Sequence, residues 1–141
     1  MPEQDELVGR LRWSVARLAR LLRQQDGPGL TPTTTATLAT IARDGPLTLG
    51  DLASAEQVAP PTITKVVAKL EAAGLVERRT DPDDGRVRTV RLTAKGRRQL
   101  ETNRSRRSAW LRERVAALSP EDRARLHDAV DVLEKLTEGP R

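Results

Sequence analysis

Residues 48–92 hold the pattern that most constrains the fold: two short helical segments, a tight turn and two extended runs follow one another without a linker. The first segment opens at Thr48, which has an acidic residue three positions later, and ends near Glu56. The second begins at Pro60 and ends at Gly74, a residue typical of a helix C-cap. Its apolar residues recur at helical spacing: Ile63, Val66, Val67 and Leu70. Two short helices joined by a tight turn predict a helix-turn-helix.

The segment after this unit predicts a β-hairpin. Residues 75–80 and 87–92 are short runs, and the second alternates apolar and polar side chains. The connector between them, Asp-Pro-Asp-Asp-Gly-Arg at residues 81–86, is dense in turn-forming residues. Because a hairpin directly after a helix-turn-helix forms a wing, the pattern favours a winged helix-turn-helix.

Further helices are predicted on both sides of the winged segment. Leucine and valine at helical spacing over residues 7–22 predict a first helix of about 20 residues. Thr31-Pro32 has the cap and first-turn proline of a short second helix. Thr93 caps a long helix that reaches about Leu118, and Ser119-Pro120 starts the last one. The predicted fold class is mainly α (α+β).

The core of this fold must be built from aliphatic residues. The 141-residue chain has 19 Leu, 11 Val and 2 Ile but no Phe or Tyr. Leu, Val and Ala suit packed helices, although this supply is small for a single domain. We therefore expect one compact domain that buries further apolar surface against a second copy.

The residue types that most catalytic and metal sites need are scarce. The chain has no Cys and one His, which excludes thiol nucleophiles, disulfides and thiolate or multi-histidine metal sites. It has no glycine-rich phosphate cradle, and Asp83-Asp84 is better explained as part of a turn than as an acid–base pair. We therefore expect neither an enzyme nor a bound cofactor or metal.

The sequence contains neither a membrane span nor a secretion signal. No apolar run approaches the roughly 18 residues that a membrane helix needs. The chain begins Met-Pro-Glu-Gln-Asp, which is acidic where a signal peptide is basic and then apolar. These features predict a cytoplasmic protein without a membrane partner.

The excess positive charge lies in one segment. Residues 59–99 hold 10 Lys and Arg against 5 Asp and Glu, whereas the other 100 residues hold 15 of each, for a net charge of +5. This distribution suggests that the segment binds a polyanion. The alternative is an arginine-rich composition set by a GC-rich genome, because 21 of the 25 basic residues are Arg.

The helix at residues 60–73 has a polar face as well as an apolar one. Opposite the apolar stripe lie Pro61, Thr62, Thr64, Lys65 and Lys69. An exposed helix start with hydroxyls, a lysine and free amides suits both phosphates and the base edges of a major groove. The alternative is that these side chains form an ordinary solvated face.

The hairpin carries five arginines: Arg78, Arg79, Arg86, Arg88 and Arg91. An arginine at a hairpin tip can enter a minor groove that is too narrow for a helix, which makes Arg86 a candidate. Asp84 is close enough in sequence to orient that guanidinium by a charge-assisted hydrogen bond. The alternative is a turn whose arginine is only solvated.

Ordered motifs run through residues 30–96: Leu-Thr-Pro (30–32), Gly-Pro-Leu-Thr (45–48), Asp-Leu-Ala (51–53), Pro-Pro-Thr-Ile-Thr-Lys (60–65), Leu-Glu-Ala-Ala-Gly-Leu-Val-Glu-Arg (70–78), Asp-Asp-Gly-Arg (83–86) and Val-Arg-Leu-Thr-Ala-Lys-Gly (90–96). At this spacing they resemble the MarR family of bacterial regulators. The resemblance implies a homodimeric winged helix-turn-helix transcription factor with long terminal dimerisation helices. It also implies binding to palindromic operators in double-stranded DNA, with release by a small, often phenolic or lipophilic, effector.

The resemblance assigns residues to these roles. Residues 60–73 become the recognition helix, with Thr62, Thr64 and Lys65 nearest the bases and Lys69 nearer the DNA backbone. Arg86 matches the wing arginine and Asp84 its supporting acid. The full set of expected DNA-contacting residues is Pro61, Thr62, Thr64, Lys65, Lys69, Asp84, Arg86 and Arg88.

Two positions depart from the family pattern. Ala59 stands where the family often has Ser, and deleting a helix cap costs roughly 0.5–2 kcal/mol. A first-turn proline, Pro60 or Pro61, offsets part of this loss. Gly85 stands where the family usually has Arg, which removes one charge from the wing. We therefore expect weaker minor-groove contact than is typical of the family.

The resemblance also divides the chain and suggests an effector site. Residues 1–29 become an N-terminal dimerisation helix, residues 30–93 the DNA-binding part and residues 94–141 the C-terminal dimerisation helices. Trp13 and Trp110 are candidate effector-binding residues, because their helices wall the effector cavity in this family; the alternative is packing in the dimer core. Residues 103–108 have three alternative roles: phosphate contact, the lining of a cavity for an anionic effector, or solvated surface.

The sequence thus predicts a dimeric, sequence-specific regulator that acts as a repressor and leaves a pseudo-palindromic operator when an effector binds. Two alternatives stay open. One is a winged-helix module that binds protein or RNA, and the other is a DNA-binding protein without an effector.

Overall fold

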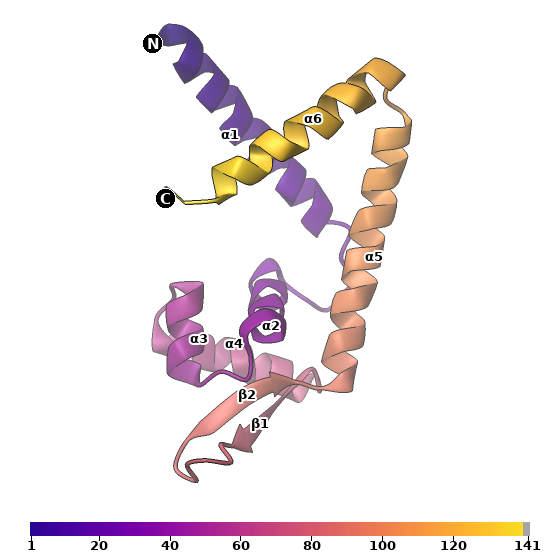
Figure 1. The fold of residues 1–141 in the computed structure, drawn as a ribbon. Coiled ribbons are helices and arrows are strands. Elements are labelled where there is room, and N and C mark those ends of the chain that lie inside the picture. Colours follow the sequence, from indigo (N-terminus) through magenta and orange to yellow (C-terminus); the bar gives the residue numbers. More distant parts are fainter. Residues whose placement is uncertain (140–141) are drawn as a thin grey trace.

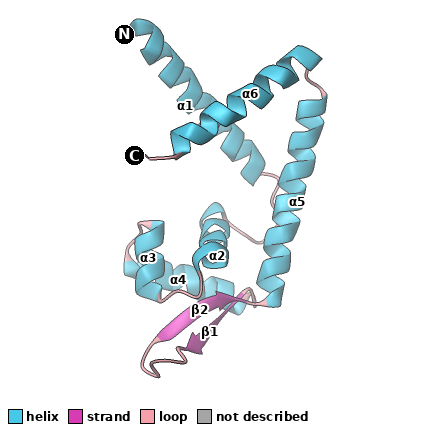
Figure 2. Cartoon of the chain, in the orientation of Figure 1, coloured by secondary structure: helices cyan, strands magenta, loops and turns pink. Residues whose placement is uncertain are grey.

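The computed structural model describes residues 1–139, which form six helices and one two-stranded sheet (Figure 1). In chain order the elements are α1 (Pro2–Arg23), α2 (Pro32–Asp44), α3 (Leu49–Glu56), α4 (Pro60–Ala72), β1 (Val76–Thr80), β2 (Arg88–Leu92), α5 (Ala94–Ala116) and α6 (Pro120–Thr137). Helix dominates, and the hairpin hangs below the helices at one end of the molecule (Figure 2). The predicted fold class is confirmed: α3 and α4 form the helix-turn-helix, and β1 and β2 form the wing.

Side-chain caps confirm the predicted helix starts. Each cap hydroxyl accepts a hydrogen bond from an amide of the first turn: Thr31 from Thr34 at 3.2 Å, Thr48 from Asp51 at 3.1 Å, Thr93 from Gly96 at 3.1 Å and Ser119 from Asp122 at 3.1 Å. These bonds satisfy amides that have no partner within their own helix. Local sequence therefore determines where α2, α3, α5 and α6 begin.

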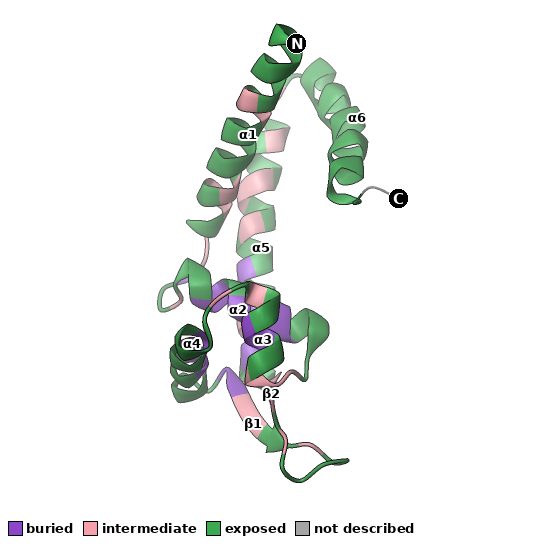
Figure 3. Ribbon diagram, turned by 90° about the vertical axis from the view of Figure 1, so that its left-hand side faces the viewer, coloured by how far each residue is buried: buried purple, intermediate pink, exposed green. Residues whose placement is uncertain are grey.

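One apolar core holds the winged unit together. Its members come from α2, α3, α4, the hairpin and the start of α5: Leu38, Ile41, Leu52, Ala53, Ile63, Val66, Val67, Leu70, Leu75, Val76, Val90, Leu92 and Leu100. Figure 3 shows these buried segments gathered around α2, α3 and β1, while α6 is exposed throughout. The predicted apolar stripe of α4 is part of this core.

The buried face of α2 differs from the pattern of its apolar residues. Ala36 and Ala42 are exposed, whereas four threonines are buried: Thr34, Thr35, Thr37 and Thr40. The Thr37 hydroxyl donates to a carbonyl one turn earlier at 3.0 Å, and the Thr40 hydroxyl donates to Glu56 of α3. A threonine with a bonded hydroxyl can be buried at little cost. The core-facing side of α2 therefore combines these threonines with Leu38 and Ile41.

The wing is an antiparallel hairpin anchored on the core. Val76 pairs with Leu92, and both are buried. Leu47, which precedes α3, exchanges two main-chain hydrogen bonds with Val90 at 3.1 and 2.7 Å. The base of the hairpin is thus fixed on two sides, and its connector projects away from the helices (Figure 1).

A polar joint holds the α1–α2 connection on α5. The Arg107 guanidinium donates two hydrogen bonds to the Asp26 carboxylate, at 2.7 and 2.5 Å. The amide of Gly27 donates to the side-chain oxygen of buried Asn103 at 3.3 Å. For Asn103 and Arg107, this structural role replaces the three alternatives considered for residues 103–108.

The helices α1 and α6 lie outside the core (Figure 1), and neither has a buried residue. Apart from Met1, the large apolar residues exposed in the described chain all belong to these two helices. They are Leu7, Val8, Trp13, Val15, Leu18, Leu126, Val130, Val132, Leu133 and Leu136. None of the described helices is apolar over the length that a bilayer crossing requires.

Candidate nucleic-acid interface

The helix α4 presents the predicted polar face to solvent. Its core-facing residues Ile63, Val66, Val67 and Leu70 are each 8% exposed or less. Its exposed residues include all five that we expected: Pro61, Thr62, Thr64, Lys65 and Lys69. The division follows from the helical period, which puts residues three and four apart on one face. The five residues therefore lie on the side of α4 that faces away from the core.

The start of α4 lacks the free amides that we expected. Pro60 and Pro61 occupy its first two positions and have no N–H. The amides of Thr62 and Ile63 donate to the carbonyl of Ala59 at 3.0 and 3.2 Å. As predicted, Ala59 provides no side-chain cap. This helix start therefore cannot bind a phosphate through main-chain amides, and its side chains must make the contacts.

The hydroxyl of Thr64 is already engaged within α4. It donates a hydrogen bond to the carbonyl of Pro60 at 3.0 Å. A hydroxyl has one hydrogen but two acceptor positions, so its oxygen can still accept. In this arrangement Thr64 suits a base that offers an amino group in the major groove, such as adenine or cytosine.

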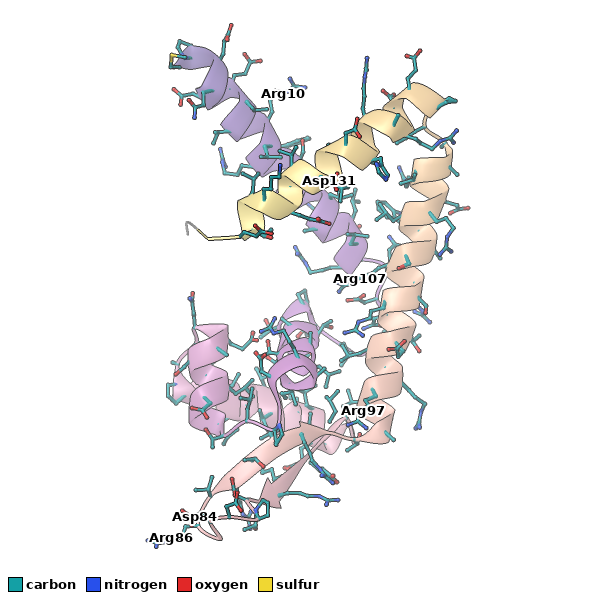
Figure 4. All side chains as sticks on the ribbon, in the orientation of Figure 1. Arg10, Asp84, Arg86, Arg97, Arg107 and Asp131 are labelled. Atoms are coloured by element: carbon teal, nitrogen blue, oxygen red, sulfur yellow. The ribbon has the colours of Figure 1, made fainter. Side chains whose placement is uncertain are left out.

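Two carboxylates order the tip of the wing. Asp81 accepts hydrogen bonds from the amides of Asp83 and Asp84 at 2.7 and 3.3 Å, and Asp84 accepts one from the amide of Arg86 at 3.0 Å. The Arg86 Nε lies 3.8 Å from the same Asp84 oxygen, and its side chain is 96% exposed. Asp84 thus fixes the main chain at Arg86. We had expected it also to hold the guanidinium by a hydrogen bond, but the distance is too long for one. Figure 4 shows both residues at the far end of the hairpin.

Three of the five wing arginines are paired with glutamates. The Nε of Arg78 lies 3.1 Å from Oε2 of Glu71 in α4. Oε1 of Glu77 lies 2.8 Å from the Nε of Arg91 and 3.2 Å from the Nε of Arg79. The hydrogen bond from Arg91 lowers the pKa of Glu77, and the charge of Arg79 adds to this effect. Glu77 is therefore ionised at neutral pH and neutralises part of the charge of the strands.

Four exposed cations on α4 and the wing have no carboxylate at hydrogen-bond distance within residues 1–139: Lys65, Lys69, Arg86 and Arg88. We call them the four free cations. On α4 and the wing, the free positive charge of the predicted segment is thus confined to one helix face and the outer part of the hairpin. The remaining hairpin arginines have structural partners.

Three acidic residues that shape this surface were not assigned a role from the sequence. Asp81 carried a usable signal, because Asp side chains commonly bond to amides two residues later in turns. Glu77 lies opposite Arg91 in the hairpin register, a pairing that known strand boundaries would have revealed. Glu71 had no local signal, because its partner belongs to another element.

Trp13 and Trp110 do not meet in one cavity. Trp13 lines a surface hollow of about 470 Å³ on α1, and Trp110 lines one of about 720 Å³ on α5. An arginine stacks on each indole: Arg17 lies 5.1 Å from the Trp13 ring centre and Arg114 lies 4.9 Å from that of Trp110. Both hollows are open surfaces of a single protomer.

A further hollow of about 550 Å³, which we call the basic hollow, lies between α2, β2 and α5. Its buried residues are apolar: Ile41, Leu92 and Leu100. Its charged residues are Arg43, Arg91, Arg97, Glu101 and Arg104. Neither tryptophan lines it. Apolar walls with a few convergent charges suit a small ligand with an apolar body and an acidic group.

Residues 1–139 contain no group of His, Cys, Asp or Glu side chains that could hold a metal ion. On the wing, Asp81 and Asp84 instead accept main-chain hydrogen bonds.

A helix-turn-helix followed directly by a β-hairpin defines the winged helix-turn-helix class of proteins, and here the second helix has an exposed polar face and the hairpin an exposed arginine at its tip. A sequence model of the MarR family matches residues 30–87. An uncharacterized HTH-type transcriptional regulator of Mycobacterium leprae is 36% identical over 136 residues, which is 95% of each chain. The chain belongs to the MarR family of transcriptional regulators and is not an enzyme.

Solved structures share the fold over nearly the whole chain. A Pseudomonas aeruginosa PA01 protein proposed to be a transcriptional regulator matches with a TM-score of 0.87 and 30% identity, covering 99% of both chains. A mutant of Staphylococcus aureus MepR bound to an oligodeoxyribonucleotide matches with a TM-score of 0.72 and 23% identity, covering 93% of this chain and 98% of MepR. MepR has also been solved with ethidium bromide.

Proposed function

We propose that this protein is a homodimeric repressor that binds a pseudo-palindromic operator in double-stranded DNA and leaves it when a small effector binds. The observation that carries DNA binding is the exposed polar face of α4 beside a wing whose outer arginines are free. A helix fits the major groove, and an arginine at a hairpin tip fits the minor groove next to it. The oligodeoxyribonucleotide complex of MepR supports this use of the fold.

The exposed apolar residues of α1 and α6 support the dimer. Neither helix buries a residue within the protomer, and a second copy would remove these side chains from water. We assign residues 1–29 and 94–141 to dimerisation and residues 30–93 to DNA binding; residues 140–141 lie outside the described chain. A two-fold dimer places its recognition helices in major grooves about 34 Å apart, which calls for a pseudo-palindromic site.

Sequencing the DNA fragments that the purified protein retains tests this function. The expected result is an enriched pseudo-palindrome whose half-sites are centred about 10–10.5 base pairs apart. Retention of duplex RNA, or no enrichment of any DNA sequence, would favour a winged-helix module for RNA or protein. Genes next to the recovered sites would also narrow the class of effector.

Single substitutions on α4 and the wing should have different effects on DNA recognition. Thr64→Ala and Lys65→Ala should each change which bases are tolerated, since a good base contact is worth about 1–3 kcal/mol of discrimination. Arg86→Ala should weaken binding with only a modest loss of sequence preference, because the minor groove carries a degenerate code. Affinities for single-base operator variants and for random DNA measure both effects. Equal losses on operator and random DNA for all three variants would contradict the recognition-helix assignment.

Repression is the simplest consequence of such binding. A dimer on two adjacent major grooves covers about 20 base pairs, enough to block a promoter that overlaps the site. Activation would require a further contact with the polymerase. A promoter fusion carrying the operator should therefore be more active when the regulator is absent. Such a regulator acts where the chromosome lies, so we place it in the cytoplasm.

The basic hollow supports release by an effector, and we expect phenolic or lipophilic acids to release the operator. Arg97→Gln should weaken the response to such a compound about tenfold, because it removes a charge-assisted hydrogen bond. Arg98→Gln is the control, since Arg98 is exposed on the same helix but does not line the hollow. Titration of the compound against the operator complex measures the effect. If no compound releases DNA, the protein is a DNA-binding protein without an effector.

The tryptophans provide a second readout for the same titration. If Trp13 or Trp110 contributes to the effector site, its fluorescence should change as the compound binds. A change in operator release without any change in fluorescence would place the effector away from both indoles and leave them to the dimer core.

A further inference from the structure

The first turn of α5 is hydrogen-bonded to the C-terminal end of α4. Three consecutive carbonyls accept these bonds: Ala73 from the Lys95 Nζ at 2.9 Å, Gly74 from the Thr93 hydroxyl at 2.6 Å and Leu75 from the Thr93 amide at 3.1 Å. The last carbonyls of a helix have no donor within the helix. The amides of Ala73, Gly74 and Leu75 supply donors for the last turn of α4, and the start of α5 supplies them for the C-cap residue Ala73 and the two residues that follow it. We call this contact the α4–α5 junction.

Two glycines make the close approach possible. Gly74 has a φ of +76°, which lets α4 end in a Schellman turn: its amide donates to Glu71 at 3.0 Å, and that of Leu75 donates to Leu70 at 2.9 Å. At Gly96 in α5, an added Cβ would lie 2.1 Å from the carbonyl oxygen of Leu75. The chain therefore cannot carry a larger residue at Gly96 without moving α5 away from α4.

The hydroxyl of Thr93 belongs to both helices at once. It donates to Gly74 and accepts from the amide of Gly96 at 3.1 Å, so its hydrogen and one acceptor position are both in use. It caps α5 with the same atom that binds the end of α4. A rotation of the first turn of α5 would therefore disturb the end of α4 directly.

Lys95 is the cation of the junction. Its ammonium group lies where the carbonyl ends of the α4 peptide dipoles give a partial negative charge, a favourable place for a cation. No ion pair with a carboxylate is formed by Lys95 within residues 1–139, and its side chain is exposed. Two roles are open to such a lysine on a DNA-binding protein: direct contact with a phosphate, or holding the end of the recognition helix.

We propose that Lys95 is a positioning residue for DNA recognition. By donating to the carbonyl of Ala73, the C-cap residue of α4, it makes the direction of the recognition helix depend on α5. The inference rests on the proposed function, in which α5 belongs to the dimerisation part. Each dimer then has two such junctions, and together they set how the two recognition helices enter successive grooves.

A matched pair of Lys→Met variants tests the proposal, because methionine keeps an unbranched apolar side chain and removes the charge. Operator DNA recovered with the wild-type protein and random DNA of equal length are titrated between 50 and 200 mM salt. Lys95→Met should bind the operator about tenfold more weakly and keep the wild-type affinity and salt dependence on random DNA. Lys95→Arg should restore operator affinity. Lys69→Met should weaken both DNAs equally and reduce the salt slope by about 0.9 for each phosphate that it no longer neutralises.

Two results would overturn the positioning role. If Lys95→Met weakens both DNAs and lowers the salt slope as Lys69→Met does, Lys95 contacts phosphate. If its operator affinity equals that of the wild type, the junction does not influence recognition. Hydrogen exchange of the amides at residues 70–75, measured without DNA, should be faster in Lys95→Met, and unchanged exchange would also overturn the proposal. A wild-type protein that does not prefer its recovered operator would instead refute the proposed function, while the exchange result would still report on the junction.

Discussion

Replacing Val130 with aspartate is expected to convert the dimer into a monomer. Operator binding should then weaken by at least about 100-fold, because one dimer no longer binds both half-sites at once. Val130 is 41% exposed on α6, on the same face as Leu126 and Leu133. In the proposed dimer this face is covered, and a buried carboxylate without a partner costs several kcal/mol. A two-fold interface contains each substitution twice, so the dimer dissociation constant should rise by roughly 10³-fold or more.

Ala124→Asp is the matched control for this substitution. It adds the same charge to the same helix, on the side opposite the stripe of Leu126, Val130 and Leu133. Sedimentation equilibrium gives the association state, and fluorescence anisotropy gives the operator affinity. The protomer should stay folded in both variants, since α6 contributes no buried residue. A Val130→Asp protein that remains dimeric, or an Ala124→Asp protein that dissociates, would refute the assignment of this stripe to the interface.

Helix boundaries in this chain are predictable because their signals are local. Thr31, Thr48, Thr93 and Ser119 each cap a helix with an amide three residues later, so the cap and its partner lie within one turn. The same holds for the end of α4, where Gly74 adopts the left-handed conformation that a Schellman turn needs. Signals of this kind do not depend on how distant segments pack.

Burial is harder to predict where polar residues enter the core. Thr37 and Thr40 of α2 are buried with hydroxyls that donate to its own preceding turn and to α3, whereas the buried hydroxyl of Thr35 has no hydrogen-bond partner within the described residues. The joint between Asp26 and Arg107 connects residues 81 positions apart. No pattern within one element indicates such partners, and the sequence therefore shows neither the burial of these threonines nor the joint.

At the candidate interface, too, some features depend only on neighbouring residues in the sequence, and others depend on residues of a different element. The exposed face of α4 follows from its period, and the position of Arg86 follows from the turn. The number of unpaired arginines on the wing does not, because it depends on Glu71 reaching Arg78 from another element and on Glu77 lying between two arginines. Counting charges along the sequence therefore overstates how many cations are free to bind DNA.

Because only part of the positive charge of the wing is unpaired, we expect operator affinity to fall by roughly 10⁴-fold between 50 and 200 mM monovalent salt. Each protomer has the four free cations Lys65, Lys69, Arg86 and Arg88, so a dimer brings about eight to the DNA. If each cation, in a groove or on the backbone, neutralises about one phosphate charge, a slope of about −0.9 per charge gives a total slope near −7. If the three glutamate-paired arginines of each wing also reached phosphates, about fourteen contacts would give a slope near −13.

Two arginine variants of the wing separate these cases in the same salt titration. Arg88→Gln removes a free cation from each protomer and should make the slope shallower by about 1.8 per dimer. Arg79→Gln removes a cation that Glu77 already pairs at 3.2 Å, so the slope should stay at its wild-type value. A wild-type slope near −13, or equal changes in the two variants, would mean that DNA breaks the ion pairs of the wing. In that case the charge available to DNA is set by the whole positive segment, because phosphates then compete successfully with Glu71 and Glu77 for the strand arginines.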